Sequence, residues 1–264
     1  MATYLDAILE AHRQRAAADV RKLKFLLADV DRCGPTRGFA AALRNADGLA
    51  VISEIKRRSP SKGALNADLN PAQMAQTYEA GGASCLSVLT DVDHFGGSAL
   101  DLQYARAACS LPVLRKDFTV DERDVVEARL IGADCVLLIA AALDDAELVA
   151  FHALATEVGL DALVEIHDEA ELERALAVGA TLIGVNQRDL VTFQVDHDRA
   201  ERMASLIPSS AVRVAESGVR DAADAARLRA AGYDAILVGE SVVTAGDPAA
   251  AVAALRGAAN YGEP

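Results

Sequence analysis

The stretch ADCVLLIAAALDDAELVAFHALATEVGLDALVEIHDEAELERALAVGATLIGV, residues 133–185, alternates short apolar runs with longer amphipathic stretches. Three runs are rich in Val, Ile and Leu, at 133–140, 162–166 and 180–185. They lack polar alternation, which is typical of strands buried on both faces of a parallel sheet. The Ala-rich stretches between them predict helices at 144–158 and 168–178. This part of the chain therefore predicts consecutive βα units.

The same alternation extends in both directions along the chain. Further apolar runs cover 49–55, 83–89, 112–115, 211–215 and 235–238. Further helices are expected at 71–81, 98–108, 122–131, 197–206, 220–231 and 247–257. Eight βα units in about 210 residues favour one closed (β/α)8 TIM barrel of the α/β class over an open doubly wound sheet of about five or six strands. The first run is also not followed by a G-x-G-x-x-G dinucleotide fingerprint.

Several predicted helices end at a glycine that the next strand follows at once. These glycines are Gly81, Gly132, Gly159, Gly179 and Gly232. A residue just beyond a helix often adopts positive φ, which glycine tolerates without steric cost. We therefore expect positive φ at each of them.

Residues 1–48 precede the first predicted strand and form a predicted helical extension. Apolar residues recur at helical spacing over 4–28, and a second short helix is expected at 36–44. These helices cover either the bottom of the barrel or the mouth of the active site, and periodicity does not choose between the two. The chain is thus divided into the extension, the barrel at 49–258 and a tail at 259–264.

The composition is that of an acidic globular protein. Of 264 residues, 39 are Asp or Glu and 26 are Lys or Arg, so the net charge is −13, and 52% of the residues are hydrophobic. So much apolar material argues against a disordered chain. The negative charge, with 4% aromatic residues and no Trp, counts against a nucleic-acid partner.

The cysteines and the apolar runs indicate a cellular location. The four cysteines are too far apart for C-x-x-C pairs, in a chain too large to need disulfides. We expect free thiols in a reducing cytoplasm. Charged residues interrupt the first thirty positions, and no apolar run reaches the length of a membrane span, so neither export nor membrane insertion is expected.

Polar residues close the predicted strands, and a (β/α)8 barrel places its chemistry at these carboxyl ends. The first run ends in Glu54 and Lys56, which are two residues apart and should both point into the barrel. Four basic residues lie within 56–62, and in so acidic a chain this cluster predicts an anion site. The alternative is a solvated loop with one Glu–Lys pair.

Two later strand ends offer an acid and a base. Lys116 closes the third run, and a buried ammonium group needs either a carboxylate partner such as Glu54 or a role as an acid. Glu165 lies between two aliphatic residues at the end of the fifth run, which makes it a candidate general base. His167 begins a predicted helix and is interpreted as a helix cap or surface residue.

The remaining strand ends predict orienting groups. Asn186 and Arg188 offer an amide and a guanidinium group after the sixth run, and Glu216 and Ser217 close the seventh. The candidate site shows no His, Cys and carboxylate cluster with the spacing of metal ligands, so no metal is expected.

A phosphate site is predicted at two glycines. Gly218 and Gly239 follow the seventh and eighth runs, and each opens a predicted helix. Backbone N–H groups can approach a phosphate closely at such positions, and a helix N-terminus supplies partial positive charge. The alternative is that these glycines only relieve turn strain.

Six strand-end motifs occur in order along the chain. They are ISEIKRRSPSKG (52–63), LPVLRKDF (111–118), ALVEIHD (162–168), IGVNQRDL (183–190), VAESGV (214–219) and ILVGESVV (236–243). Together they closely resemble the indole-3-glycerol phosphate synthase family, the ring-closing enzymes of tryptophan biosynthesis. The resemblance runs from the N-terminal helix to the last βα unit.

The resemblance implies that 1-(2-carboxyphenylamino)-1-deoxyribulose 5-phosphate is converted to indole-3-glycerol phosphate, with release of CO2 and water and without a cofactor. It implies that Lys116 is the general acid of ring closure and that Glu165 is the base that completes dehydration. Lys56 would hold the substrate carboxylate and assist the acid chemistry. Orienting roles would fall to Glu54, Asn186 and Ser217.

The resemblance also implies binding groups for the rest of this phosphosugar. The phosphate would be bound by Ser59, Gly218, Gly239 and the start of the following helix at Glu240. The apolar wall around the aromatic ring would consist of Phe118, Leu137, Ile139 and Leu190. Arg188 and Glu216 are further polar residues of the site.

Two residues depart from the family pattern. Gln187 stands where the family often has Asn, and Glu240 stands where a small or neutral residue is common. A carboxylate would repel a phosphate, so Glu240 should point away from it or weaken the contact.

Two other functions remain open. The first is that of another phosphate-binding (β/α)8 enzyme, such as an isomerase of phosphoribosyl anthranilate, which would need a catalytic Cys where the first strand has Glu54 and Lys56. A non-catalytic phosphosugar-binding protein would not need Glu165 as a general base. We expect a monomer or a weak homo-oligomer.

Overall fold

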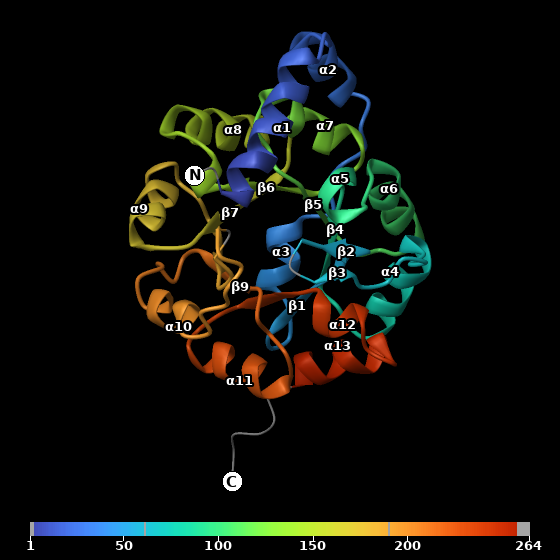
Figure 1. Cartoon of the computed structure of the whole chain (residues 1–264), viewed down its shortest axis with the longest axis vertical. Coiled ribbons are helices and arrows are strands. Elements are labelled where there is room, and N and C mark those ends of the chain that lie inside the picture. Colours follow the sequence, from blue (N-terminus) through green and yellow to red (C-terminus); the bar gives the residue numbers. More distant parts are fainter. Residues whose placement is uncertain (1–2, 61, 190, 258–264) are drawn as a thin grey trace.

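In the computed structural model, which describes residues 3–60, 62–189 and 191–257, eight parallel strands close into a barrel (Figure 1). The strands are β1 (Ala50–Ile55), β4 (Cys85–Leu89), β5 (Val113–Lys116), β6 (Cys135–Ile139), β7 (Asp161–Ile166), β8 (Leu182–Asn186), β9 (Val212–Glu216) and β10 (Ala235–Val238). β1 pairs with both β4 and β10, which closes the ring. The predicted (β/α)8 barrel is confirmed.

A ring of helices surrounds the strands (Figure 1). The helices are α4 (Pro71–Ala80), α6 (Ala99–Ala108), α7 (Glu122–Leu130), α8 (Asp145–Glu157), α9 (Glu169–Ala177), α10 (Arg199–Ala204), α11 (Ala222–Ala230) and α13 (Pro248–Arg256). All but α10 begin after an Asp, Asn or Ser whose side chain accepts a hydrogen bond from a backbone N–H of the first turn. These caps satisfy N–H groups that have no partner within the helix, so each loop gives way to a helix at a defined residue.

The strands are apolar on both faces because each face packs against a separate layer. Leu137 belongs to the cluster inside the barrel, and the next residue, Leu138, packs in the layer between strands and helices. Leu163 and Val164 divide in the same way on β7. Successive side chains of a strand point to opposite faces, so a strand buried on both sides shows an unbroken apolar run.

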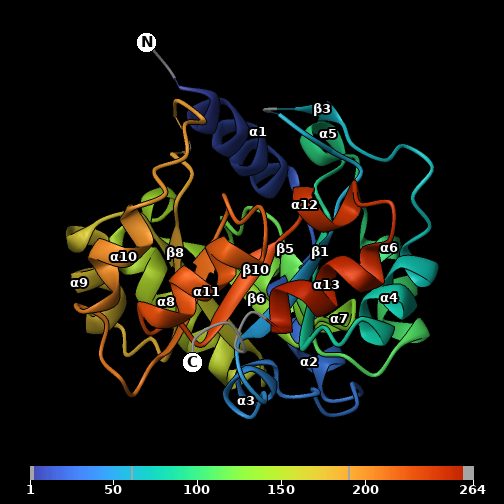
Figure 2. The ribbon, with the colours of Figure 1, turned by 90° about the horizontal axis from the view of Figure 1, so that it is seen from below.

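The N-terminal helices lie at opposite ends of the barrel (Figure 2). α1 (Tyr4–Ala18) lies over the carboxyl ends of the strands, where its first turns line a cavity. α3 (Phe39–Arg44) closes the amino end, where Phe39 packs into the barrel interior and Ala40 N–H donates to Asp161 Oδ2 at 2.9 Å. Both of the expected positions are therefore occupied, by different helices.

The prediction of one helix over 4–28 is wrong. α1 ends at Ala18, and a second helix, α2 (Leu23–Val30), packs against α7. Between them Asp19 Oδ1 accepts from the Arg21 N–H at 2.9 Å, and Arg123 donates to the carbonyl oxygen of Ala16 at 2.8 Å. These contacts satisfy groups that a continuous helix would bond internally, so the chain turns here.

The structure contains short elements that the apolar pattern did not predict. They are the hairpin of β2 (Arg58–Ser59) and β3 (Gly63–Ala64), the helix α5 (Val92–Phe95) and the 3-10 helix η1 (Ala140–Ala142). The short helix α12 (Glu240–Val243) follows Gly239, where a helix was predicted to begin. Each follows the carboxyl end of a barrel strand. They therefore shape the mouth of the barrel and leave the ring of helices unchanged.

The glycine prediction is confirmed at Gly132, Gly159, Gly179 and Gly232, which have positive φ. It is wrong at Gly81, whose φ is −74°, because the following Gly82 takes the positive value of +87°. A Cβ at Gly81 would lie 2.6 Å from the carbonyl oxygen of Ala249. This glycine instead lets α4 approach α13 closely.

Free cysteine thiols and the absence of membrane-spanning helices were also predicted. The four cysteines, Cys33, Cys85, Cys109 and Cys135, are free. Among the residues that the structure describes, none of the helices combines the length and the apolar character needed to cross a membrane.

Candidate active site

A cavity of about 610 Å³ opens at the carboxyl ends of the barrel strands. The described residues predicted for the site all line it, whereas Leu190 lies outside the described residues. Tyr4, Leu5 and Ile8 of α1 form part of the roof of this cavity. The residues that were chosen because they close the barrel strands therefore lie together in one cavity, as is usual for (β/α)8 barrels.

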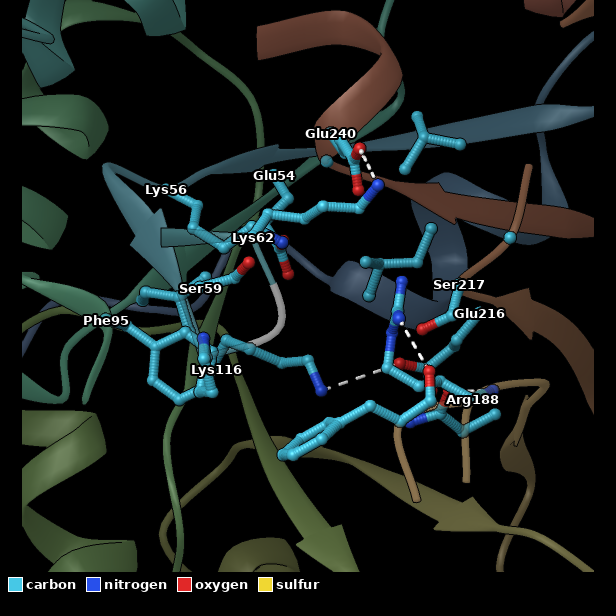
Figure 3. A pocket seen from close by; sticks show the side chains of 18 of the residues that line it. Glu54, Lys56, Ser59, Lys62, Phe95, Lys116, Arg188, Glu216, Ser217 and Glu240 are labelled. Atoms are coloured by element: carbon cyan, nitrogen blue, oxygen red, sulfur yellow. Dashed lines mark hydrogen bonds and ion pairs between the residues drawn. The ribbon is translucent and has the colours of Figure 1, made fainter. Parts of the chain in front are cut away.

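Lys116 lies between two buried carboxyl groups. Its Nζ is 2.9 Å from Glu165 Oε2 and 3.6 Å from Glu216 Oε2. The three side chains come from β5, β7 and β9, and Figure 3 shows Lys116 extending across the pocket toward the side that holds Glu216. The sequence suggested Glu54 as a partner of Lys116, but Glu54 forms an ion pair with Lys56 instead.

The two carboxyl groups around Lys116 differ in acidity. Burial alone would raise the pKa of Glu165, but Lys116, with further help from His167 and Asn186, holds it well below its ordinary value. Burial and the neighbouring Glu165 raise the pKa of Glu216 to about 8 despite Lys116. At neutral pH Glu165 is therefore an anion and Glu216 is mostly protonated.

The ammonium group itself stays charged. Burial lowers the pKa of Lys116, but Glu165, Glu216 and Glu54 more than offset this and raise it above its ordinary value. One cation thus serves a cluster of carboxyl groups, and the group that keeps its proton is the one farther from the lysine.

The basic cluster at 56–62 is divided between the cavity and the outer layer. Lys56 and Lys62 line the cavity. Arg57 instead pairs with Asp101 of α6, and Arg58 donates to the carbonyl oxygen of Val92 at 3.0 Å. The predicted anion site therefore rests on the two lysines, because the two arginines fasten the loop after β1 to its neighbours.

Asn186 orients the base candidate. Its Nδ2 donates to Glu165 Oε1 at 3.0 Å, and its Oδ1 accepts from the Arg188 N–H at 3.0 Å. The Arg188 side chain turns to the carbonyl oxygen of Phe193 at 3.1 Å. The amide is thus held at both ends, and Glu165 Oε2 is left to face Lys116.

Two glycines make room for the acidic side chains. A Cβ at Gly184 would lie 2.0 Å from Glu216 Oε1, and one at Gly239 would lie 2.3 Å from Glu54 Oε1. Both distances are far below a van der Waals contact, so each glutamate occupies the volume that a side chain would need. Gly239 therefore has a packing role besides any contact with a phosphate.

The residues predicted to bind the phosphate all line the cavity: Ser59, Gly218, Gly239 and Glu240. Gly218 has a φ of +74°, and the preceding Ser217 has the same unusual sign, at +66°. Glu240 Oε1 lies 3.4 Å from Lys62 Nζ at the rim (Figure 3), so the charge of this unexpected carboxylate is paired.

The family model described as indole-3-glycerol phosphate synthase matches residues 5–255. The chain belongs to the indole-3-glycerol phosphate synthase family. It is 51% identical to indole-3-glycerol phosphate synthase 2 of Streptomyces coelicolor over 252 residues, which cover 96% of each chain. It is 48% identical to the indole-3-glycerol phosphate synthase of a Polaromonas species, over 97% of this chain and 99% of the relative.

Solved structures of other enzymes share the fold of this synthase family member. A thiamine phosphate pyrophosphorylase from Pyrococcus furiosus matches with a TM-score of 0.59 and 16% identity, over 80% of this chain and 94% of its own. A 3-hexulose-6-phosphate synthase matches with a TM-score of 0.61 and 17% identity, over 80% of this chain and 99% of its own. At these identities the likeness concerns the barrel alone.

The sequence left open whether the N-terminal helices cover the cavity, and it did not predict which residues form the roof. Tyr4 packs edge-on against Phe193 at 5.2 Å and against His94 at 5.9 Å between ring centroids. Phe118, Leu137 and Ile139 of the predicted apolar wall line the cavity below it. His197 and Arg220 also line the cavity and were not predicted. They lie in loops beyond the strand ends, where no periodic signal marks them.

A second unpredicted feature fastens α1 to the barrel. His12 Nε2 is 2.9 Å from Asp91 Oδ2 and 3.9 Å from Asp117 Oδ1. In the described ranges these three form the one group whose ligand-type atoms all lie within 4.8 Å of one another. The sequence analysis expected no such cluster among the candidate site residues, and this group instead joins three residues that are far apart in sequence and were not predicted for the site. Asp91 already accepts from His94 N–H at 2.6 Å and Asp117 from Phe118 N–H at 2.9 Å, so the group fits an internal network.

Proposed function

We propose that this chain closes the indole ring of indole-3-glycerol phosphate in the cavity under α1, with Lys116 as the general acid and Glu165 as the general base. The observation that carries the assignment of roles is the contact of one ammonium group with two carboxyl groups of opposite protonation state. Membership of the synthase family supports the reaction. The substrate is 1-(2-carboxyphenylamino)-1-deoxyribulose 5-phosphate.

Ring closure joins the carboxyl-bearing ring carbon to the ketone carbon. The charged Lys116 donates its proton to the ketone oxygen as that bond forms, which avoids an unstabilised alkoxide. The ring carbon–carboxylate bond then breaks, CO2 leaves, and the electron pair restores the aromatic ring. Lys56, which is paired with Glu54, binds the carboxylate before it leaves.

Dehydration removes the new hydroxyl group and one proton of the substrate. Glu165 accepts that proton, and the hydroxyl leaves as water after it is protonated, a step that Lys56 assists. Glu165 suits this role because it is an anion at neutral pH and because Asn186 holds its other oxygen at 3.0 Å. Acid and base come from different strands, as proton transfers from two directions require.

We assign the remaining predicted residues to binding and orientation. Glu54 orients Lys56, Ser217 lies beside the reacting ring, and Glu216 and Arg188 complete the polar lining. The phosphate is bound by Ser59 and by backbone N–H groups at Gly218, Gly239 and Glu240. The aromatic ring packs on Phe118, Leu137 and Ile139, and Leu190 stays a predicted member of this wall.

Some broader expectations remain proposals. We infer that residues 1–48 act as an extension of the barrel, because α1 roofs the cavity and α3 fills the opposite end. We propose a cytoplasmic protein, in keeping with its free thiols, and a monomer or weak homo-oligomer. Light scattering on the purified chain over a range of concentrations measures the oligomeric state.

The function is tested by mixing purified protein with the carboxyphenylamino deoxyribulose phosphate. We expect the absorbance and fluorescence of an indole to appear, with one CO2 released per indole. Tight binding of the substrate without CO2 release would identify a non-catalytic phosphosugar-binding protein. Turnover of phosphoribosyl anthranilate in place of this substrate would identify the isomerase.

A further inference from the structure

His167 stands behind Glu165, between two carboxyl groups. It follows β7 directly and is not one of the described residues that line the cavity. Its Nδ1 is 3.1 Å from Glu171 Oε2, and the same oxygen accepts from the His167 backbone N–H at 2.7 Å. Its Nε2 lies 3.8 Å from Glu165 Oε1.

The second ring nitrogen is buried and unsatisfied. Among the residues the structure describes, His167 Nε2 has no hydrogen-bond partner, and Glu165 Oε1 is within ion-pair distance of it. A carboxylate accepts hydrogen bonds only, so Glu171 selects a proton on Nδ1. A neutral ring would then turn the lone pair of Nε2 toward the Glu165 anion, whereas a second proton makes this contact attractive.

The surrounding charges favour the second proton. The groups that act on His167 are Glu165 of β7, Glu171 of α9 and Arg199 of α10. Burial lowers the pKa of His167, and Arg199 adds to this, but Glu171 and Glu165 outweigh both and raise the pKa above its ordinary value. The two neighbouring carboxylates therefore favour the imidazolium ion over the neutral ring.

We propose that His167 is a positioning residue for Glu165: its cationic ring attracts Oε1, and Oε2 is thereby kept turned to Lys116 and the cavity. The inference rests on the proposed function, in which Glu165 is the base. His167 shares Oε1 with Asn186, whose amide is 3.0 Å away. The hydrogen bond from the Asn186 amide orients Glu165 Oε1, and the His167 ring adds a positive charge that is lost as the pH rises.

Two substitutions separate the two ring nitrogens. His167→Asn places an amide near Nδ1, so it keeps the contact with Glu171 and loses the group that faces Glu165. His167→Gln reaches the position of Nε2 with a neutral donor. His152 of α8 lies outside the cavity lining, and His152→Asn serves as the matched control.

The expected results concern kcat and its pH dependence. At pH 6.5 His167→Asn should lower kcat about tenfold with KM changed less than about twofold, since the charge that faces Glu165 Oε1 at 3.8 Å is lost and substrate contacts remain. His167→Gln should recover kcat to within about threefold of the wild type. The wild type should lose kcat as the pH rises through the His167 pKa, and both variants should lack this limb.

The pKa of Glu216 is raised to about 8, so this carboxyl group could also produce a pH-dependent limb in kcat. A limb due to Glu216 would persist in His167→Asn and vanish in Glu216→Gln. Wild-type kcat and an unchanged pH profile in His167→Asn would overturn the inference. Equal losses of kcat and of Tm in both His167 variants would also overturn it, because they would indicate a purely structural histidine.

A measurement without turnover keeps the inference separate from the proposed function. NMR of protein labelled in its histidine rings should show His167 titrating above pH 6.5, and at lower pH in Glu165→Gln. Titration below pH 6.5 in the wild type overturns the inference even if the enzyme is fully active. An inactive wild type with the expected titration would overturn the proposed function alone.

Discussion

The two ends of the barrel both bury acidic side chains but treat them differently. At the amino end, Asp134 accepts hydrogen bonds from Arg37 N–H at 2.8 Å, from Val113 N–H at 2.8 Å and from Arg106 Nη2 at 3.0 Å. At the carboxyl end, neither oxygen of Glu216 has a hydrogen-bond partner among the described residues. Burial of a carboxyl group therefore does not by itself identify a site, because Asp134 is as buried as Glu216 but is fully hydrogen-bonded.

The same difference is visible in how each end is closed. α3 fills the amino end with Phe39, which is fully buried. α1 covers the carboxyl end but leaves a cavity of about 610 Å³ beneath Tyr4 and Ile8. At the amino end the acidic side chain of Asp134 stabilises the fold. At the carboxyl end the acidic side chains line a cavity that is accessible to a ligand.

The largest expected effect is the loss of turnover at the carboxyl end. Lys116→Met removes the proton donor, so kcat for indole formation should fall at least ~10² to 10⁴-fold. Asp134→Asn at the amino end should leave kcat and KM unchanged and lower the free energy of unfolding by about 1 to 3 kcal/mol, because three donors then face an amide. Steady-state kinetics and denaturant melts of both variants test the comparison, which fails if Asp134→Asn also abolishes turnover.

The contact between Lys116 and Glu165 adds a stability effect to this prediction. Each single variant leaves one member of a buried pair alone, at a cost of roughly 3 to 5 kcal/mol where the remaining group cannot change its protonation state. The double variant Lys116→Met with Glu165→Gln should regain most of this stability and none of the turnover. If the double variant regained turnover as well as stability, Lys116 and Glu165 would form a purely structural ion pair.

A smaller loss of turnover is expected from filling the space beside Glu216. Gly184→Ala places a Cβ 2.0 Å from Glu216 Oε1, so the carboxyl group must move and the ion network with Lys116 must shift. We expect kcat to fall by up to roughly 10²-fold, as misplacement by about 1 Å can cost. Gly246→Ala, where a Cβ meets nothing within 4 Å, is the control. Equal activity of the two variants would refute the claim that Glu216 needs this volume.

The pH dependence of stability should differ in sign between the two carboxyl groups of the site. The pKa of Glu216 is raised to about 8 in the folded chain, so the unfolded chain loses this proton first and stability falls as the pH rises from about 4.5 to 8. The pKa of Glu165 is lowered in the folded chain, so its contribution to the free energy of unfolding is instead lost as the pH falls through that pKa. Glu216→Gln should therefore gain Tm relative to the wild type as the pH increases across that range. Parallel Tm curves for the two proteins would contradict the raised pKa.

The smallest effect concerns the rim. Glu240→Gln frees Lys62 from its partner 3.4 Å away and removes a negative charge near the proposed phosphate site. We expect KM to fall by about two- to threefold at low salt, and less at high salt, with kcat unchanged. Lys62→Met should raise KM. A salt-independent response would assign the pair a structural role.

The strands and their polar ends were predictable because they depend on local pattern. A strand such as β6 is apolar on both faces, and Lys116 and Glu165 stand where apolar runs stop. Distances across the barrel are not in the pattern: β5, β7 and β9 are not neighbours in the sheet. The sequence therefore suggested Glu54 as a partner of Lys116, whereas the structure pairs Lys116 with Glu165. The resemblance to a family supplied roles, and the fold supplied the pairing.

The roof was not predictable for a similar reason. α1 and α3 are both short amphipathic segments, and which end of the barrel each covers depends on partners such as Asp91 and Asp161, far away in sequence. His167 was interpreted as a cap because its position before a helix is a local signal. Its contact with Glu165 arises only when β7 and α9 fold together.

The volumes shared between a glycine and a glutamate also constrain how this barrel can be altered. Gly184 on β8 lies beside Glu216 on β9, and Gly239 after β10 lies beside Glu54 on β1. In each pair the glutamate side chain occupies the volume that a side chain at the glycine position would need. Either glutamate can be shortened alone, but a larger residue at the glycine displaces the glutamate side chain unless that glutamate has been shortened first. At these two positions a new side chain is therefore best introduced by a pair of substitutions, the glutamate first and the glycine second, and a library that varies one position at a time will miss these combinations.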